Sequence, residues 1–557
     1  MNNLIVNLVL GDIASLLKIK GANNYKIRAY ENAIAKIKNL DVDIKDLVDK
    51  GELTEISGIG KSLANTIQEI IFTGSCEEYD NLIKEYPPSI IPLLKVSGIG
   101  PSKVKLLYNK LNIEDLEDLK RKAELGQLTQ ISGIGAKTEG KILSSVNKLL
   151  DETDKLDLGE ASLLSNKLKT YLDKFKDVHR IKVIGSLRRK EEIINKISLI
   201  IECRDFQVIS KNIKILPIIS EILEENNQKL ILNSKLGVKI ELIRASSSDF
   251  WNKVFWLTGT EEYNKKLKSV FSIRQGDLEN KFESEKNIFN KLNIPYIIPE
   301  LRSDLEILDR AREDSLPLSI KNEDIKGDLH IHSNWSDGRY TIEEMARACQ
   351  NRGYEYLSIC DHTHSLTIAN GLDVDRLKRQ WEEIDKLNEE LNIRILKGAE
   401  VDILNDSLDY GDNILESLDV VIASIHSGFG DSQEDMMKRI MIALNNPYVD
   451  ILGHPTGRLV LGRASYNINF EKLVHKAVET NTILEINSAP KRLDLNSHNV
   501  KLAHKLGANF IINTDAHKMK QLDNMKFGVG VARKGWLEKE DVINTLSLSD
   551  LKDFLTK

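Results

Sequence analysis

The sequence contains little cysteine, with only four in 557 residues: Cys76, Cys203, Cys349 and Cys360. They are scattered along the chain and none belongs to a C-x-x-C pair. This pattern argues against a disulfide framework and against a thiolate zinc site. It is typical of a reducing compartment, so we expect a cytoplasmic protein.

The sequence also lacks an apolar run approaching the ~20 residues that span a bilayer. Residues 1–21 are apolar but interrupted by Asn3, Asn7 and Asp12, and they have neither a basic leader nor a small-residue cleavage site. We expect an amphipathic helix there and no membrane partner. The net charge of −6 gives no bulk indication of nucleic acid, so any such signal must be local. The length predicts three or four domains.

A five-residue phrase occurs three times early in the chain, as I-S-G-I-G at 56–60, V-S-G-I-G at 96–100 and I-S-G-I-G at 131–135. An amphipathic helical pattern follows each copy. The glycines permit a tight turn with positive φ, and they bring backbone N–H groups to a helix start, where a phosphate oxygen can bind. The phrases resemble helix-hairpin-helix motifs, which bind the DNA backbone without reading bases. The residues implied in DNA binding are Gly58, Gly60, Gly98, Gly100, Lys103, Lys105, Gly133 and Gly135.

A G-I-G turn can instead serve only to join packed helices, and one copy alone would favour that interpretation. Three copies, each directly before a helix, favour sequence-independent DNA binding. Local charge agrees, because residues 13–30 and 94–110 each contain four basic residues and no acidic one. A basic run is usually just a solvated face, so the charge adds support without deciding the matter.

Residues 180–202 predict a strand, a turn, a helix or loop, and a second strand, with G-S-L-R-R at 185–189. Together with WLTGTEEYN at 256–264 and the later IPYIIPELR, this order resembles family X DNA polymerases over roughly residues 1–320. The resemblance implies a nucleotidyltransferase palm. It also implies that Ser186 and Arg189 bind a phosphate or a DNA end.

The sequence departs from that family where the polymerase metals bind. The family has a D-x-D pair on the second strand, and the i, i+2 spacing puts both carboxylates on one face to hold two magnesium ions. Here the positions are Lys196 and Ser198, and the third carboxylate falls on Glu241. One carboxylate beside a repelling ammonium group cannot assemble two divalent cations. Glu202 as a shifted ligand would need a different geometry, so we expect synthesis to be lost or very weak.

The helix after the first G-I-G phrase departs from the family as well. Family members that cleave abasic sites through a Schiff base carry a lysine two residues after the alanine of this helix. Here Ala64 leads to Thr66, and a hydroxyl group cannot form an imine. We therefore expect no lyase chemistry, and we interpret the first 320 residues as a DNA-positioning scaffold.

From about residue 326, seven short apolar strands alternate with helical stretches, which predicts a parallel barrel. In such barrels the chemistry lies where strands end. A lone histidine is usually a core or surface residue, but six of the eleven histidines fall at these ends, with two aspartates and a glutamate. This pattern predicts a shared metal centre. Its ligands would be His330, His332, Asp337, His362, Glu400, His426, His454, Asp515 and His517.

The motifs H-x-H…SDG, DH, G-x-E, S-x-H, GHP and D-x-H resemble those of PHP phosphoesterase domains from residue 326 to about 557. Bacterial and archaeal family X polymerases carry such a domain at the carboxy terminus. The resemblance implies up to three ions, and the nitrogen and oxygen ligands suit Mn²⁺ or Zn²⁺. It groups the ligands as His330, His332, Glu400 and Asp515, then Glu400, His426 and His454, then Asp337, His362 and His517.

The ligands imply a hydrolytic mechanism. We expect a metal-bound hydroxide, available because coordination lowers the pKa of water from 15.7 to roughly 7, to attack the terminal phosphodiester. Arg458, in GHPTGR after the fifth strand, is a candidate phosphate clamp, and a surface-loop arginine is an equally good interpretation.

The predicted fold class is multidomain α and α/β. It comprises helical helix-hairpin-helix domains at 1–85 and 86–155, a degenerate nucleotidyltransferase-like palm and thumb at 156–320, and a distorted (β/α)7 PHP barrel at 325–557. The predicted function is a metal-dependent 3′→5′ exonuclease or 3′-end-processing phosphodiesterase in DNA repair, acting as a monomer on gapped, nicked or 3′ ends. The alternatives are an active gap-filling family X polymerase with a PHP nuclease, a small-molecule phosphatase, and a non-catalytic DNA-end-binding protein.

Overall fold

The computed structural model describes residues 2–38, 40, 42–152, 154–216, 218–274, 276–278 and 281–555. The chain divides into two units. The first comprises Met1–Lys155, Lys167–His179 and Cys203–Arg244, and the second comprises Leu156–Asn166, Arg180–Glu202 and Ala245–Lys557. The domain boundaries near residues 85, 155 and 320 stay a prediction.

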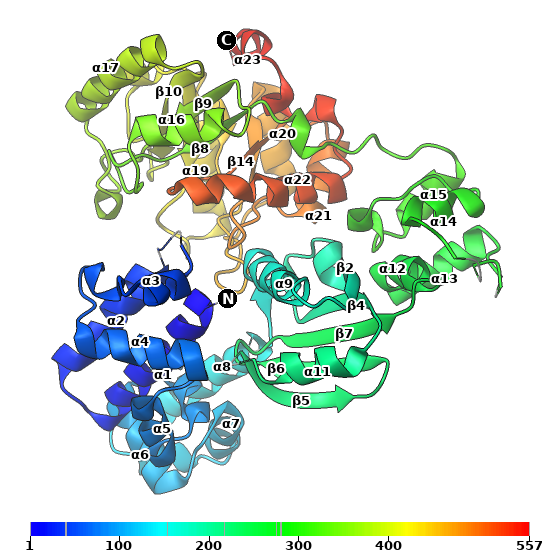
Figure 1. Ribbon diagram of the computed structural model, residues 1–557. Helices are drawn as coiled ribbons and strands as arrows, with labels where there is room; N and C mark the ends of the chain where they lie inside the picture. Colours follow the sequence, from blue (N-terminus) through cyan, green and yellow to red (C-terminus); the bar gives the residue numbers. More distant parts are fainter. Residues whose placement is uncertain are drawn as a thin grey trace. The chain divides into compact units, whose positions relative to one another are not determined.

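The first unit is mainly helical (Figure 1). Apolar side chains of its successive helices share one hydrophobic core, in which α1 packs against α2, α4, α5 and α6. The helices are α1 (Asn2–Lys20), α2 (Asn24–Lys38), α3 (Ile44–Lys50), α4 (Lys61–Thr73), α5 (Glu77–Glu85), α6 (Pro101–Leu111), α7 (Leu116–Glu124), α8 (Ala136–Glu152) and α11 (Phe206–Lys214).

Helix α1 is the one described helix whose length and composition would allow it to cross a membrane. A buried core helix of a soluble protein meets the same criterion. Val6, Leu10 and Leu16 of α1 are fully buried inside the helical unit. The apolar face of α1 therefore serves the core, and its composition gives no support for a membrane span.

Each G-I-G phrase forms a turn directly before a helix, as the sequence predicts. Helices α4, α6 and α8 begin immediately after the three copies. The first glycine of each copy, Gly58, Gly98 and Gly133, has a φ of 93°, 84° and 81°, a region that favours glycine. The second glycine does not need this freedom. Gly60 and Gly100 have extended backbone and cap α4 and α6.

The second and third copies lie side by side. A Cβ added to Gly98 would meet Cγ2 of Thr138 in α8 at 3.9 Å, and one added to Gly133 would meet Cε of Lys103 in α6 at 3.9 Å. Each hairpin therefore faces the helix that follows the other hairpin. The two motifs form a reciprocal tandem rather than two separate turns.

The predicted strand–turn–strand pattern of residues 180–202 is also present. A short helix, α10 (Gly185–Arg188), follows β2 (Val178–Ile184) and precedes β3 (Ile193–Ile194), which pairs with β1 (Leu156–Asp157) before α9 (Leu158–Leu172). A five-stranded sheet has the order β2-β4-β7-β6-β5, with β4 (Lys196–Cys203), β5 (Ile219–Glu225), β6 (Lys229–Ser234) and β7 (Lys239–Ala245). In β4, Lys196 is exposed and Ser198 is buried.

Four helices follow in the second unit: α12 (Phe250–Thr258), α13 (Glu261–Val270), α14 (Glu285–Lys291) and α15 (Glu306–Arg312). They share an apolar core that includes Trp536. Within it, the buried Glu285 forms ion pairs with Arg188 and Arg302 at 2.8 and 2.6 Å. A buried carboxylate needs such partners, since an unpaired charge is costly to remove from water.

The predicted barrel is present, and its seven strands run parallel in sequence order from β8 to β14. A parallel bridge between Ile331 and Ala516 joins the last strand to the first, so the barrel is nearly closed. The strands are buried along their length, as expected where helices cover a parallel sheet. They are β8 (Gly327–Ile331), β9 (Tyr356–Ile359), β10 (Arg394–Asp402), β11 (Val420–Ser424), β12 (Ile451–Leu452), β13 (Ile483–Asn487) and β14 (Phe510–Asn513).

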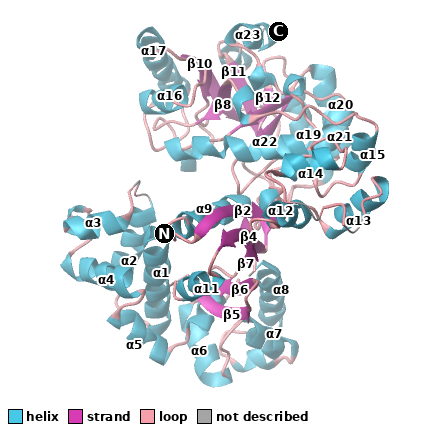
Figure 2. Ribbon diagram, turned by 45° about the vertical axis from the view of Figure 1, so that its right-hand side comes forward, coloured by secondary structure: helices cyan, strands magenta, loops and turns pink. Residues whose placement is uncertain are grey.

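Helices surround these strands (Figures 1 and 2). Local sequence sets their starts, as in the first of them, where Thr341 and Glu344 form a reciprocal capping box. The barrel helices are α16 (Ile342–Gln350), α17 (Val374–Glu390), α18 (Asp412–Leu415), α19 (Gln433–Asn445), α20 (Phe470–Thr480), α21 (Ser497–Lys505), α22 (Met525–Lys534) and α23 (Leu548–Leu555).

Candidate metal centre

The predicted metal ligands gather at the carboxyl ends of the barrel strands. His330 lies in β8 and the other ligands follow strand ends, except Glu400, which stands inside β10 two residues before its end. Because all seven strands are parallel, their carboxyl ends share one rim of the barrel. The strand β13 contributes none of the nine predicted ligands.

Glu400 is the centre of this cluster. Its Oε2 atom lies 3.3 Å from Nε2 of His330, 3.5 Å from Nε2 of His332 and 3.0 Å from Nδ1 of His362. Its Oε1 atom lies 3.3 and 3.0 Å from the Nε2 atoms of two further histidines, His426 and His454. One carboxylate therefore faces five imidazoles, which come from four strands (β8, β9, β11 and β12) or the loops after them.

A second focus lies nearer the solvent. Asp337 Oδ1 is 3.3 Å from Nε2 of His517 and 3.8 Å from Nε2 of His362. Asp515 Oδ1 is 3.2 Å from Nε2 of His332 and 3.7 Å from Nδ1 of His517. The exposed fraction rises from 0% for the His332 side chain to 36% for that of Asp337, so the cluster extends from the barrel interior to its surface.

Seven of the nine predicted ligands fall into three groups of closely spaced ligand atoms, and His454 and Asp515 are in none of these groups. Three groups have ligand atoms within 4.8 Å of one another: His330, His332 and Glu400; His362, Glu400 and His426; and His332, Asp337, His362 and His517. His332 and His362 thus each border two groups, which the strand order alone does not indicate.

The donor atoms fit divalent cations. Two ligands at about 2.1 Å from a tetrahedral ion lie about 3.4 Å apart, and the Glu400 distances of 3.0–3.5 Å bracket that value. Four converging buried atoms have no hydrogen-bond partner within the described part of the chain: His330 Nε2, His332 Nε2, His362 Nδ1 and Glu400 Oε2. Buried polar atoms are nearly always satisfied, so this set indicates a site built for ions.

The ligand residues differ in protonation. Burial lowers the pKa of His332 to about 3, and the neighbouring His517 and His362 reinforce the effect, so this imidazole is neutral. Burial alone would lower the pKa values of His330, His426 and His517, but neighbouring carboxylates raise that of His330 well above its ordinary value and those of His426 and His517 to about 9. Burial alone would raise the pKa of Glu400, but His362, His330 and His426 hold it well below its ordinary value. Because metals bind neutral imidazoles and an ionised carboxylate, these protonated histidines must lose a proton when an ion binds.

A buried acid that the sequence analysis did not select holds the cluster in place. This acid is Glu485 of β13. Its Oε1 atom is 2.7 Å from Nδ1 of His330, and its Oε2 atom accepts a hydrogen bond from the backbone N–H of His454 at 2.7 Å. Its side chain is fully buried. The signal was available in T-I-L-E-I-N, where Glu485 and Asn487 are the polar residues of a buried strand at i, i+2 spacing. Asp402 plays a similar part for His426, at 3.3 Å from its Nδ1.

A cavity of about 360 Å³ opens onto the ligands. Arg492 lines it, with its Nε 3.5 Å from Oδ2 of Asp515. Arg458, the predicted phosphate clamp, is not among the described residues that line this cavity, and its guanidinium forms an ion pair with Glu192. The arginine that borders the metal ligands is therefore a different residue from the predicted one.

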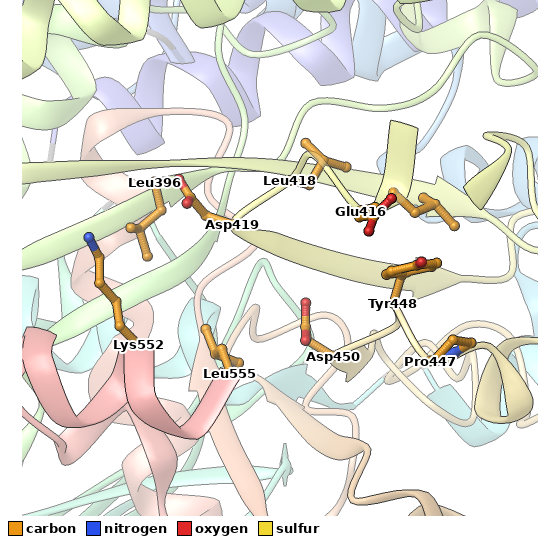
Figure 3. A pocket seen from close by; sticks show the side chains of 10 residues that line it. Leu396, Glu416, Leu418, Asp419, Pro447, Tyr448, Asp450, Lys552 and Leu555 are labelled. Carbon is orange, nitrogen blue, oxygen red and sulfur yellow. The ribbon is translucent and has the colours of Figure 1, made fainter. Parts of the chain in front are cut away.

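A larger cavity, of about 570 Å³, lies at the amino ends of β11 and β12 (Figure 3). Its carboxylates serve the fold, since Asp419 accepts the backbone N–H of Lys397 at 2.8 Å and Asp450 accepts that of Val421 at 2.9 Å. No histidine is among its described lining residues. The candidate metal ligands lie instead at the opposite, carboxyl end of the strands.

The residues of the predicted polymerase site have other partners. Arg189 donates to the backbone oxygen of Thr258 at 2.6 Å and to Glu191 at 3.2 Å. Glu202, the alternative ligand, forms an ion pair with Arg180. Ser186 lies in α10, and Lys196 and Ser198 lie on β4 as the sequence predicts.

Glu241, the third predicted carboxylate, is buried in β7 and lies 3.9 Å from the ammonium group of Lys229. In the helical unit, Lys105 donates to the backbone oxygen of Lys20, and Lys103 donates to that of Gly98. The basic run 13–30 is partly neutralised, because Lys18 and Lys20 each pair with a glutamate at 2.6 Å. The DNA-binding roles stay a prediction.

Three parts of the chain match known families. Residues 1–76 match a helix-hairpin-helix domain, residues 90–148 a SAM-like helix-hairpin-helix tandem, and residues 328–489 the PHP domain. With the parallel barrel and its His/Asp/Glu clusters, the PHP match defines the class of metal-dependent hydrolases, here attached to helix-hairpin-helix domains.

The chain is 37% identical over 566 residues to the DNA polymerase/3'-5' exonuclease PolX of Bacillus subtilis (strain 168), which covers 99% of this chain and 98% of that protein. The chain belongs to the PolX family, and the predicted resemblance is confirmed. Over 241 residues it is 31% identical to a probable phosphatase of Thermoanaerobacter sp. (strain X514), covering 41% of this chain and 93% of that protein. A probable phosphatase of Clostridium novyi (strain NT) is 30% identical over 248 residues, covering 41% and 92%.

Proposed function

We propose that this chain is a metal-dependent 3′→5′ exonuclease or 3′-end-processing phosphodiesterase that acts on DNA in repair. The observation that carries the proposal is the convergence of five histidines on Glu400, with four buried ligand atoms that lack hydrogen-bond partners among the described residues. The nine predicted residues would hold up to three Mn²⁺ or Zn²⁺ ions. We further propose a cytoplasmic monomer.

The side chains of the site have different proposed roles. When bound, divalent ions polarise a phosphodiester and supply an activated water near neutral pH. Glu400 and the buried histidines hold the inner positions, and the more exposed Asp337 and His517 border the solvent. Arg492, at the wall of the cavity, contacts a non-bridging phosphate oxygen in the role expected for Arg458. Glu485 keeps His330 oriented and does not itself contact the phosphate.

The amino-terminal unit would supply DNA binding. Its second and third hairpins form a reciprocal tandem, and each hairpin ends at a helix start. Helix starts offer unpaired N–H groups and a positive dipole end to phosphate oxygens. Such contacts do not depend on base sequence. We propose gapped, nicked or free 3′ ends as the substrates.

Polymerase activity is proposed to be absent or very weak. Lys196 and Ser198 occupy the positions of the metal-binding aspartates. Glu202 is the one acid on that face of β4, and it forms an ion pair with Arg180. The counter-argument is the relative of Bacillus subtilis, whose name includes DNA polymerase. A small-molecule phosphatase is the second alternative, favoured by the probable phosphatases that match the barrel region. The helix-hairpin-helix domains argue against it.

One assay separates these functions. A 5′-labelled gapped duplex is incubated with the protein and Mn²⁺, with and without nucleotides. The proposal expects shortening in both cases, whereas lengthening with nucleotides supports the polymerase. Faster hydrolysis of p-nitrophenyl phosphate than of the DNA end supports the phosphatase.

Variants connect the activity to the barrel. His332→Ala and Asp515→Ala should abolish the shortening while duplex binding remains. His475→Ala is the matched control, because His475 is an exposed histidine of α20 outside the three ligand groups. A His332→Ala protein that still shortens DNA at the rate of the wild type would refute the proposal.

A further inference from the structure

The cavity above the metal ligands has one apolar wall. Leu366, Ile368 and Ala369 line it together with Arg492 and seven of the nine predicted ligands. All three belong to residues 364–371, which we call the rim loop. Ile368 is 93% exposed, the highest value among the exposed large apolar side chains of the described residues, and it alone of that set borders this cavity. The other exposed apolar side chains are scattered, which is normal for a protein surface.

The rim loop is held firmly, so the exposure of Ile368 is a feature of a fixed backbone. At its start, the Ser365 N–H donates to Asp409 at 2.9 Å and the hydroxyl to Asp402 at 3.1 Å. At its end, the Asn370 side chain donates to the backbone oxygen of Trp335 at 3.1 Å, and Arg376 donates to the Asn370 backbone oxygen at 2.8 Å.

The last residue of the loop is equally constrained. A Cβ added to Gly371 would lie 1.9 Å from the backbone oxygen of Thr363, so this position admits only glycine without a shift of the backbone. Between these anchors the chain makes a single 3-10 turn, Thr367–Ala369. Its tip therefore presents Ile368 to solvent at the mouth of the cavity in one conformation.

We propose that the rim loop receives the terminal nucleobase of the DNA strand being shortened, with Ile368 packing against the face of the base. This inference rests on the proposed exonuclease function. In the proposed arrangement the metal ligands and Arg492 act on the phosphate. The phosphate is charged, so it would gain nothing from contact with the apolar wall. Near a terminal phosphodiester, the largest apolar surface is the face of the last nucleotide's base. A base presents the same flat apolar face whatever its identity, so the contact suits an enzyme that ignores sequence.

The test compares two 3′ ends on the same 5′-labelled duplex, one with an ordinary terminal nucleotide and one with an abasic terminal residue. Ile368→Ser should raise KM for the ordinary end about tenfold and leave kcat unchanged. The contact between a base and an apolar or aromatic side chain typically contributes about tenfold to binding affinity. The variant should leave the abasic end unchanged. Ile368→Leu should restore most of the loss. Leu318→Ser is the matched control, since Leu318 is 82% exposed and lies outside the cavity.

A binding measurement without turnover supplies a second readout. With 2-aminopurine as the terminal base and EDTA present, wild type and Leu318→Ser should change the fluorescence of the base on binding, and Ile368→Ser should not. Equal kinetic loss on both ends, or no loss on either, would overturn the role of Ile368 while the nuclease proposal stands. A wild-type protein that shortens neither end refutes the proposed function and this inference with it.

Discussion

Replacing Glu485 by glutamine tests whether the cluster is a metal centre and whether its orientation comes from β13. The carboxylate makes four hydrogen bonds: Oε1 with the His330 ring at 2.7 Å and Asn513 at 3.1 Å, and Oε2 with the His454 backbone N–H at 2.7 Å and Asn487 at 3.2 Å. Glutamine has nearly the same volume but one acceptor oxygen, so its NH₂ group must face one of these two pairs, each of which includes a ligand residue. A buried donor without its acceptor costs about 1–3 kcal/mol.

The expected loss falls on metal affinity, since in either orientation a ligand residue, His330 or His454, loses its carboxylate partner. A partner of this kind is typically worth about 10- to 100-fold in affinity, equivalent to about 1.4–2.7 kcal/mol, which agrees with the hydrogen-bond figure. Affinity for Mn²⁺ or Zn²⁺ is measured by competition with a chromogenic chelator, and DNA shortening is measured at saturating metal. Saturation should recover most of the activity, because Glu485 does not contact the phosphate in the proposed arrangement.

Asp450→Asn is the matched control. Asp450 is also a buried acid of a barrel strand end, but it accepts a backbone N–H at the amino end, away from the ligands. Its loss should lower stability in urea and leave metal affinity unchanged. Equal metal affinity in Glu485→Gln and wild type would refute the orienting role. An equal loss in both variants would mean that general loosening of the barrel is responsible.

Three further outcomes are expected. Arg492→Ala should lower kcat for a labelled DNA end about 100-fold, and Arg458→Ala should leave it within about threefold; the reverse order would restore the clamp to Arg458. The pKa of Glu285 is lowered from 4.5 to about 2, because its ion pairs outweigh burial. Above pH 4.5 the ionised Glu285 thus contributes about 3 kcal/mol to the free energy of unfolding, and this contribution is lost as pH falls towards 2. Urea unfolding of Glu285→Gln should not show this decline with falling pH. Gly98→Ala should destabilise by about 1 kcal/mol, whereas Gly140→Ala, inside α8 with open space at its Cβ, should stabilise by up to about 1 kcal/mol, as urea unfolding can check.

The barrel, and the gathering of the candidate ligands at one rim of it, were predictable because two periodicities determine them. Alternation along a strand puts His330 and His332 on one face, and a parallel order brings all carboxyl ends to one rim. The sharing of Glu400 was predicted, but the sharing of His332 and His362 was not. His332 approaches His517 because the bridge from Ile331 to Ala516 nearly closes the barrel. The order of the strands in the chain gives the order of the ligands around the rim. It does not give the distance between the first and the last strand, where the barrel closes.

Charge was the least predictable property, because a sequence window contains only its own acids. Residues 13–30 contain no acid, yet in the fold Lys20 pairs with Glu85 from another helix. Arg458 stands beside a ligand motif in sequence, but its partner Glu192 lies more than two hundred residues earlier. Arg492 follows a strand without a predicted ligand, so nothing in the sequence analysis directed attention to it.

The same distant pairing bears on the polymerase question. In α10 and directly after it, Arg188 contacts Glu285 with two nitrogens and Arg189 pairs with Glu191, which also pairs with Lys534 of α22. Guanidinium groups engaged in this way are poorly placed to receive the phosphates of a nucleotide. Restoring two carboxylates on β4 would therefore supply metal ligands without freeing the phosphate contacts. The ion pair between Glu191 and Lys534 connects this segment to α22, a helix of the barrel. The arginines of the segment therefore stabilise the unit that contains the candidate metal ligands.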